Sequence, residues 1–302
     1  MKVIITGGTG LIGRALGQSL VARGHQVWAL TRSPQSAHLP SGIEPVGWDG
    51  ETPRGWQPLV EQADAVINLA GENLGAGRWS LERKARILNS RLNAGRAVVQ
   101  ALQAATHRPH TLIQASAVGY YGPGDNTLLT ESSPAGQDYL AQVAVAWEKS
   151  TAEAETLGLR RVVVRTGIVL DAHEGALPRL VLPFRFMAGG PLGSGRQYLP
   201  WIHLVDEVNA IQFLLENPSA NGPYNLAAPQ PLSQSDFGRV LGRVLRRPYW
   251  LPAPAFALHL ALGEMSTLVL DGQRAVPSRL LELGYSFAYP DLEPALNHIL
   301  KT

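Results

Sequence analysis

Cysteine is absent from this 302-residue sequence, and long apolar runs are absent as well. Without a thiol there is no disulfide framework, no thiolate metal site and no cysteine nucleophile. His107 and His110 lack a third ligand nearby, so no metal site is expected. The opening residues are too short an apolar stretch for a signal peptide, and no window approaches the ~20 apolar residues of a membrane span. We therefore expect a cytoplasmic protein without a membrane partner.

Lysine is scarce, and acidic and basic charges nearly cancel. The 26 basic residues comprise 22 arginines and four lysines, Lys2, Lys84, Lys149 and Lys301, and the net charge is +2. The arginines are scattered, with no basic run of five or more and no interleaved aromatic stripe. A nucleic-acid partner is therefore not expected.

Strand-like and helix-like segments alternate through the first half of the chain. Bursts of β-branched and apolar residues typical of strands occur at 3–6, 26–31, 65–71, 111–117 and 160–170. Amphipathic segments typical of helices end near 22 and span about 80–105 and 139–157. This alternation predicts an α/β fold, a doubly wound parallel Rossmann sheet with helices on both faces.

The composition of the sequence changes after residue 171. The stretch "GALPRLVLPFRFMAGGPLGSGRQYLPWIH" is rich in glycine, proline and aromatic residues, which suits a substrate-facing excursion better than another strand–helix unit. Helical patterns follow at "VDEVNAIQFLLEN" and through 233–301, and "GPYNLAAP" between them indicates a returning strand. We expect a dinucleotide-binding Rossmann domain formed by 1–170 with about 206–229. A smaller, mostly helical substrate lobe is expected from about 171–205 with 230–302.

Gly7, Gly10 and Gly13 form a G-x-x-G-x-x-G run in "TGGTGLIG", directly between the first strand and the first helix. The first glycine lets the backbone turn, the second lets a pyrophosphate approach, and the third lets helix and strand pack closely. The helix start also offers free N–H groups and the positive end of its dipole to phosphates. This context predicts a dinucleotide site.

The end of the second predicted strand indicates which dinucleotide binds. NAD sites usually place an acidic residue there to accept a hydrogen bond from the ribose 2′-OH, but this chain has Thr31, Arg32 and Ser33. Arginine matches a phosphate with two parallel hydrogen bonds. We therefore predict NADP(H) as the cofactor; in the alternative interpretation, Arg32 is only a solvated charge at the strand end.

Characteristic motifs are distributed along nearly the whole chain. They include "TGGTGLIG", "NLAGENL", "GYYG", "RTGIVL", "GGPLGSGRQYLPWIH" and "LVLDGQRAVPSRLL". In these the chain resembles the extended short-chain dehydrogenases/reductases, and within them an atypical epimerase family group, similar to NAD-dependent epimerases/dehydratases, with a C-terminal domain of unknown function. The resemblance implies an NADP(H) binder whose cofactor contacts come from Gly7, Thr9, Gly10, Leu11, Ile12, Gly13, Thr31, Arg32, Leu69, Ala70, Arg91 and Val169. Arg91 has a second interpretation, an arginine on a helix surface.

The tyrosine–lysine pair that passes a proton in the wider superfamily is missing. Tyr139 is followed four residues later by Val143, and Lys149 lies too far along the same predicted helix to replace the lysine. A tyrosine has a pKa near ~10, so without a nearby cation it is a poor base at neutral pH. No arginine lies between Arg108 and Arg160, so no local substitute is visible.

The catalytic serine of the superfamily is also displaced. Its position falls on Ala117, which leaves Ser116 as the candidate catalytic hydroxyl, although Ser116 is one place away on a strand and faces the opposite side. Tyr120 and Tyr121 are the remaining candidates for the acid, and in the alternative interpretation they pack under the nicotinamide. A site without any proton relay also stays open. Glu148 is expected to face solvent or to cap a packing interaction; in the alternative interpretation it orients a ligand.

The stretch "GSGRQYLPWIH" combines a glycine loop, a cation and aromatic faces, which suits a phosphorylated or nucleotide-linked ligand. We predict that Arg196, Gln197, Trp201 and His203 bind the substrate; in the alternative interpretation Trp201 and His203 belong to the core. Asp206, just after this stretch, is expected to cap the next helix.

Two functions remain open from the sequence. The main hypothesis is an NADP(H)-dependent oxidoreductase or epimerase that acts on an unidentified carbonyl or sugar-nucleotide-like small molecule, as a monomer or homodimer. The rival is a non-enzymatic NADP(H)-binding sensor or scaffold. The missing tyrosine–lysine pair favours the rival, whereas the resemblance favours the enzyme.

Overall fold

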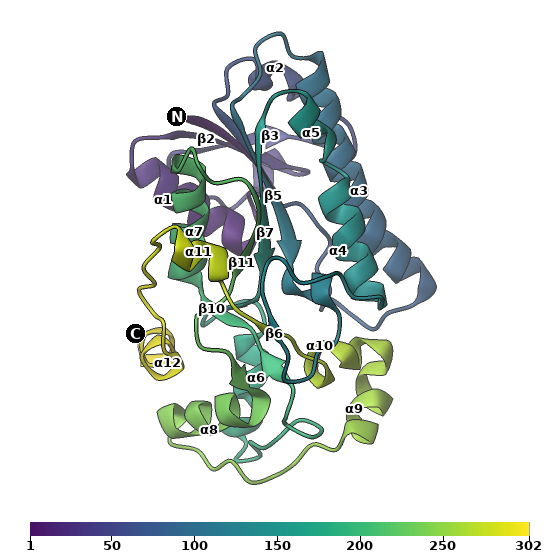
Figure 1. Cartoon of the computed structure of the whole chain (residues 1–302), viewed down its shortest axis with the longest axis vertical. Helices are drawn as coiled ribbons and strands as arrows, with labels where there is room; N and C mark the ends of the chain where they lie inside the picture. Colours follow the sequence, from purple (N-terminus) through teal and green to yellow (C-terminus); the bar gives the residue numbers. More distant parts are fainter. Residues whose placement is uncertain (302) are drawn as a thin grey trace.

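The computed structural model describes residues 1–301 and is built around one seven-stranded sheet (Figure 1). All strands of this sheet run parallel, in the order β11-β7-β5-β4-β1-β2-β3. The strands are β1 (Lys2–Thr6), β2 (Gln26–Thr31), β3 (Ile43–Gly47), β4 (Ala65–Asn68), β5 (Thr111–Ala117), β7 (Arg160–Thr166) and β11 (Gly222–Leu226). The predicted doubly wound parallel sheet is confirmed.

Helices cover both faces of the sheet. α1 (Leu11–Ala22) and α7 (Leu204–Glu216) lie side by side on one face, and α3 (Leu81–Ala104) and α4 (Tyr139–Lys149) lie on the other (Figure 1). The strands are accordingly apolar on both sides, as parallel strands covered by helices need to be, and β4 is buried along its whole length. Two large apolar clusters result, one on each face.

The order of the strands reverses at β1 and β4, which are neighbours. β2 and β3 extend the sheet on one side of β1, whereas β4, β5, β7 and β11 extend it on the other. In such sheets, ligands bind in the crevice outside the carboxyl ends of the strands at the point of reversal. The glycine loop follows β1 directly, so the topology places it at this edge.

Most residues after β8 (Ile168–Leu170), apart from α7 and β11, form a smaller, mostly helical part below the sheet in Figure 1. Its helices are α6 (Leu177–Arg185), α8 (Gln234–Leu245), α9 (Ala255–Leu262), α10 (Thr267–Leu270) and α12 (Leu292–Lys301), whereas the short helix α11 (Ser278–Glu282) packs against β11 beside α7 (Figure 1). A third apolar cluster joins α6, α8 and α12. In residues 1–301 no helix is both long enough and apolar enough to cross a membrane.

The remaining elements are short. Three pairs of strands stand outside the central sheet: β6 (Leu128–Leu129) with β13 (Arg274–Ala275), β8 (Ile168–Leu170) with β10 (Trp201–His203), and β9 (Tyr198–Leu199) with β12 (Leu232–Ser233). The short helices are α2 (Gln57–Val60), α5 (Glu153–Thr156) and the 3-10 turns η1 (Pro34–Ser36), η2 (Val118–Tyr121) and η3 (Gly263–Ser266). The pairs β8–β10 and β6–β13 link the helical part to the strand ends.

Two departures from the predicted elements have local causes. The sequence pattern gives no sign of β3, because an edge strand pairs on one side only and tolerates both exposure and Pro45. The helix predicted at 139–157 ends at Lys149 and resumes as α5. The hydroxyl of Ser150 donates to Trp147 O at 2.7 Å, a local bond that competes with the helical ladder.

The strand predicted at 160–170 divides at Gly167 into two strands of different sheets. β7 stays in the central sheet, whereas β8 pairs with β10. A Cβ on Gly167 would lie 2.0 Å from Pro200 O, and Ile168 N donates to the same oxygen at 2.7 Å. Only glycine allows this close approach, so the chain leaves the sheet here.

Asp206 is not the helix cap that the sequence predicts. His203 caps α7, and its Nδ1 accepts from Val205 N at 2.9 Å. Asp206 lies fully buried within the first turn, and its carboxylate accepts from Ala288 N at 2.7 Å and Tyr289 N at 2.8 Å. The carboxylate therefore fastens the segment before α12 to α7.

Replacing Asp206 with alanine should lower the free energy of unfolding by about 3 kcal/mol, because two N–H groups lose a charged acceptor. Urea denaturation of the variant and the wild type measures the difference. Asp206→Asn keeps one acceptor oxygen and should lose less. A loss in Asp206→Ala of under about 1 kcal/mol would show that other contacts hold the segment.

Candidate functional site

The glycine loop between β1 and α1 has the geometry of a phosphate cradle. Gly7 has a φ of +67°, and a Cβ there would lie 2.9 Å from Leu69 C. A Cβ on Gly13 would lie 2.4 Å from Gly7 O, so no side chain fits at either position. Gly10 is exposed, and among the described residues no side chain caps the first turn of α1. The N–H groups of this turn are available to an anion.

The residues predicted around this loop lie beside it. Ala70 N donates to Thr6 Oγ1 at 3.2 Å, which holds the residues after β4 against the end of β1. Arg14 in α1 donates to the carbonyl of Thr9 and pairs with Glu174. These bonds tie the residues after β4 and those after β8 to the glycine loop.

β8 approaches the glycine loop through the turn that follows it. A Cβ on Gly175 would lie 3.4 Å from Val169 O and 3.7 Å from Leu11 Cδ2. Leu11, Ile12 and Val169 are all half-buried. The structure therefore brings residues from the first and the second half of the chain to one edge, as the predicted cofactor contacts require.

Arg32 stands just beyond the end of β2. It is exposed, and within residues 1–301 its guanidinium makes no hydrogen bond or ion pair. The hydroxyl of Thr31 accepts from Ser33 N at 3.3 Å, which shapes the turn. An arginine without a protein partner at this place keeps all its donors for a ligand.

A cavity of about 170 Å³ opens at the carboxyl ends of β5 and β7. One wall is the apolar face of α4, with Leu140, Val143, Ala144 and Trp147. Its opposite wall comes from the residues before β10 and from the segment 267–273. Polar side chains of the lining are Arg91, Thr166, Tyr198, Thr267, Asp271 and Gln273. The site is therefore an apolar pocket with a few polar groups, as small-molecule sites generally are.

Arg91 is a lining residue of this cavity, so its interpretation as a surface arginine is wrong. It is buried in α3, and its guanidinium donates to Ile87 O at 2.9 Å and to Glu72 O at 3.2 Å. The guanidinium carbon also lies 4.8 Å from the ring centroid of Trp147. Burial lowers the pKa of Arg91 to about 10, which leaves it charged at neutral pH.

Val143 occupies the position of the missing lysine and lines the cavity. Tyr139 does receive a cation, but from α3: the Lys84 ammonium lies 4.5 Å from its ring centroid, and the tyrosine hydroxyl donates to Lys84 O at 2.8 Å. Burial nevertheless raises the pKa of Tyr139, and the charge of Arg91 only opposes that rise. Tyr139 is therefore a packing residue of the α3–α4 contact.

Ser116 and Glu148 belong to a buried network behind the cavity. Ser116 Oγ donates to Glu148 Oε1 at 2.7 Å, and Arg165 pairs with both oxygens of this carboxylate, at 2.8 and 3.0 Å. The expectation that Glu148 faces solvent is wrong. Ser116 is not among the residues lining the cavity, which agrees with its predicted direction away from Ala117.

Tyr120 and Tyr121 turn toward the same network, so the structure does not place them as acids of the cavity. Tyr121 OH donates to Asn225 Oδ1 at 2.7 Å and accepts from Arg165 at 3.1 Å, and burial raises the pKa of Tyr121. The ring centroid of Tyr120 lies 3.5 Å from the Arg165 guanidinium carbon. Val118 and Gly119 of the same turn line the cavity, but among the described residues these two tyrosines do not.

The predicted substrate residues Arg196, Gln197, Trp201 and His203 do not line the cavity. Arg196 is exposed, and buried Gln197 donates to Leu192 O and Val269 O at 3.0 and 2.8 Å. The alternative interpretation of Trp201 and His203 is the right one, since both are buried. Tyr198, Leu199 and Pro200 of the same stretch do reach the cavity. The prediction therefore identified the stretch that reaches the cavity, but the four residues named for the substrate are either turned into the core or exposed to solvent.

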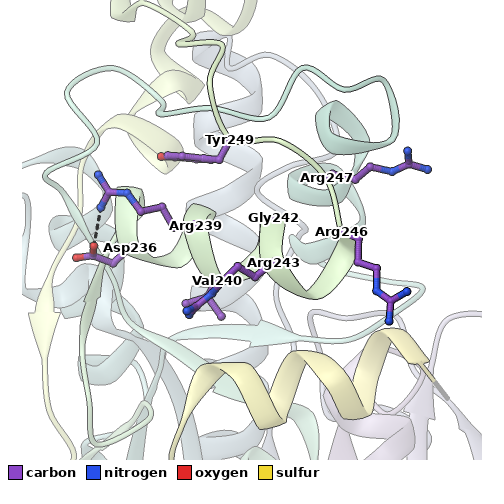
Figure 2. Close-up of a pocket in the computed structure, with 8 residues that line it drawn as sticks. All are labelled: Asp236, Arg239, Val240, Gly242, Arg243, Arg246, Arg247 and Tyr249. Atoms are coloured by element: carbon purple, nitrogen blue, oxygen red, sulfur yellow. Dashed lines mark hydrogen bonds and ion pairs between the residues drawn. The ribbon is translucent and has the colours of Figure 1, made fainter.

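A second depression of about 790 Å³ lies on α8 and the following turn (Figure 2). Arg239 turns back to Asp236 at 2.8 Å, and Arg243 pairs with Glu293 at 3.1 Å. Figure 2 shows Arg246 and Arg247 directed outward rather than toward one common point. The described residues form no set of converging donors there, so the cavity beside β5 and β7 is the better candidate site.

Residues 3–227 match the NAD dependent epimerase/dehydratase family. The chain belongs to this family. Residues 253–299 match a domain of unknown function, DUF1731, which contributes the C-terminal wall of the cavity.

Several relatives and solved structures cover this epimerase family chain. Epimerase family protein YfhF from Bacillus subtilis is 41% identical over 99% of this chain and 98% of its own length. A chloroplastic homolog of epimerase family protein SDR39U1 from Arabidopsis thaliana is 42% identical over 100% of this chain and 87% of its own length. Human SDR39U1, crystallised with NADPH, is 32% identical, with a TM-score of 0.87 and full coverage of both chains. UDP-glucose 4-epimerase from Thermotoga maritima, with UDP-glucose, shares the fold at 15% identity and a TM-score of 0.82, over 100% of this chain and 98% of its own.

Asp271 is a cavity residue of this family member that sequence reasoning missed. It stands in the motif "LVLDGQRAVPSRLL", which carries part of the family resemblance, but nothing in the motif says which side chain faces the cavity. Burial raises the pKa of Asp271, and the nearby charge of Asp138 raises it further. A carboxyl group with these properties in an apolar pocket is a candidate acid.

His203 should make the stability of the protein depend on pH. It is buried against Tyr289, with ring centroids 4.0 Å apart, and burial and His298 lower its pKa from 6.5 to about 4. As pH falls below 6.5, the unfolded chain takes up this proton before the folded chain does, so stability should fall down to about pH 4. His203→Asn, which can still cap α7, should flatten this part of a urea-denaturation profile. An unchanged slope would contradict the assignment.

Proposed function

We propose that the chain is an NADP(H)-dependent oxidoreductase that acts on a small carbonyl compound. The observation that carries the proposal is the alignment of three features along one edge of the sheet: the side-chain-free glycine loop, the unpartnered Arg32 and the cavity beside β5 and β7. The NADPH bound to human SDR39U1 is consistent with this proposal. Gly7, Thr9, Gly10, Leu11, Ile12, Gly13, Leu69, Ala70, Arg91 and Val169 are the remaining proposed cofactor contacts.

The size of the cavity supports a small substrate. About 170 Å³ is below the roughly 300 Å³ at which pockets for drug-sized ligands begin. This favours a compact carbonyl compound over a nucleotide sugar. In this proposal the dinucleotide domain is 1–170 with about 206–229, and the substrate lies in the cavity between it and the lobe of about 171–205 and 230–302. A cytoplasmic location and a monomeric or homodimeric state stay predictions.

When bound, NADPH supplies a hydride equivalent, and reduction of a carbonyl then requires one proton at the oxygen. Asp271 is the proposed source, because it is a carboxyl group of the cavity lining whose pKa burial raises. Arg91 lies against Trp147 on the α4 side of the cavity and supplies a fixed positive charge there, and the apolar face of α4 excludes water. This assignment moves the acid from α4, where the superfamily has it, to the C-terminal lobe.

A second function, an NADP(H)-binding sensor or scaffold without catalysis, is favoured by one observation. Val143 fills the lysine position with an apolar side chain that lines the cavity. A protein whose cofactor pocket lacks a proton relay would bind the dinucleotide but would not convert a substrate.

Arg32→Ala is expected to weaken NADPH binding by tenfold or more, because loss of a charge-assisted bond costs roughly 1.5–3 kcal/mol. Binding of NADH, which lacks the 2′-phosphate, should not change. Isothermal titration calorimetry gives both dissociation constants. Arg23→Ala, at the far end of α1, is the matched control. Equal NADPH dissociation constants for the wild type and Arg32→Ala would show that Arg32 does not bind the 2′-phosphate.

Turnover should be found when the NADPH-loaded protein is screened against small aldehydes, ketones and quinones, with UDP-, GDP- and dTDP-sugars as a second panel. We expect Asp271→Asn to lower kcat about 100-fold without weakening NADPH binding. Tyr120→Phe and Tyr121→Phe should keep activity. Tight NADPH binding without turnover on either panel would favour the sensor.

A further inference from the structure

Glu207 is a buried carboxyl group that has no charged partner among residues 1–301. It lies in the first turns of α7 and is 0% exposed. Thr166 Oγ1 donates to Glu207 Oε1 at 2.8 Å, and Oε2 has no hydrogen-bond partner within residues 1–301. An ionised carboxylate in such a place is costly, because neither a cation nor N–H donors replace the lost water. The mechanism proposed above assigns this group no role.

The surroundings of Glu207 favour its protonated form at neutral pH. Burial raises the pKa of Glu207 to about 8, and the bond from Thr166 only limits that rise. Two other ionisable groups lie near it. Asp206 is committed to the N–H groups of Ala288 and Tyr289. The hydroxyl of Tyr285 donates to Asp206 O. Burial is the main cause that raises the pKa of Tyr285, and the charges of Asp206 and Glu207 raise it further. Neither group supplies a positive charge.

Thr166 connects this carboxyl group to the candidate site. It is the last residue of β7, and it lines the cavity together with Gly167 and Ile168. Glu207 therefore stands one side chain behind the cavity wall, on the α7 face of the sheet. A charge that appears in the cavity acts on Glu207 through a medium of low dielectric constant, where charge interactions are strong.

We infer that Glu207, through Thr166, is a buried proton site that responds to the oxidation state of the nicotinamide. This inference rests on the proposed binding of NADP(H). The oxidised nicotinamide ring carries a positive charge and the reduced ring is neutral, so the oxidised form favours the carboxylate and the reduced form favours the acid. Because such coupling is reciprocal, ionisation of Glu207 must strengthen binding of the oxidised form selectively.

The experiment measures the dissociation constants of NADP⁺ and NADPH by isothermal titration calorimetry between about pH 6.5 and 9.5, which brackets the pKa of Glu207 at about 8. The ratio of the two constants is the quantity of interest, since titration of the 2′-phosphate affects both dinucleotides alike and cancels. We expect the ratio to shift toward NADP⁺ by about fivefold as pH rises, the low end of typical coupling between sites.

Glu207→Gln keeps an oxygen for Thr166 and carries no titratable proton, so the ratio should become independent of pH in this range. Glu216→Gln, at the exposed end of the same helix, is the matched control and should keep the wild-type shift. Thr166→Val removes the hydrogen bond that favours the carboxylate, so it should move the midpoint of the shift to higher pH. This variant keeps the inference testable where Glu207→Gln fails to fold.

A wild-type ratio that does not change with pH, with both dinucleotides bound, would overturn the inference and leave the proposed function intact. A shift that survives Glu207→Gln but disappears in Asp271→Asn would assign the coupling to the cavity carboxyl and also overturn it. If neither dinucleotide binds, the proposed function and the inference both fall.

Discussion

The buried ion pair of Arg165 and Glu148 holds together the elements around the cavity. Arg165, near the end of β7, bonds both oxygens of Glu148 on α4, at 2.8 and 3.0 Å. The same guanidinium donates to Tyr121 and lies over Tyr120, so it also fixes the turn after β5. Removing one partner of such a pair leaves a buried charge, which costs about 3–5 kcal/mol. The direction of the apolar face of α4 is therefore set by a contact outside the cavity.

This arrangement changes where acid–base chemistry is available. Cations lie over the rings of Tyr120, Tyr139 and Trp147, so these aromatic groups serve as packing partners of Arg165, Lys84 and Arg91. α4 contributes apolar residues to the cavity, and the carboxyl and hydroxyl groups come from β7, from the residues before β10 and from the C-terminal segment. The wider superfamily that this chain resembles has its catalytic acid on this helix. In this chain the carboxyl group of the cavity lies on the opposite wall, at Asp271.

Features with a local cause were predictable from the sequence. The glycine loop and the parallel sheet follow from residue spacing within single strand–turn–helix units, and both were predicted correctly. The missing lysine was recognised for the same reason, since it is a matter of i,i+4 spacing. Features that depend on contacts between distant segments were not predictable: the break at Gly167 comes from Pro200, and the burial of Arg91 comes from α4. The cation over Tyr139 was not predictable for the same reason, because Lys84 approaches this ring from another helix.

The sequence by itself determined the fold class, the position of the glycine loop and the absence of a tyrosine–lysine pair, because periodicity and short spacings dictate these. Only the tertiary structure decided which residues face the cavity. Tyr198 reaches it whereas Gln197 and Trp201 do not, and Asp271 and Thr166 come to its walls from segments a hundred residues apart. The physical reason is that a side chain's environment is set by the packing of whole elements against one another, and a linear sequence specifies that packing only through all of its contacts together.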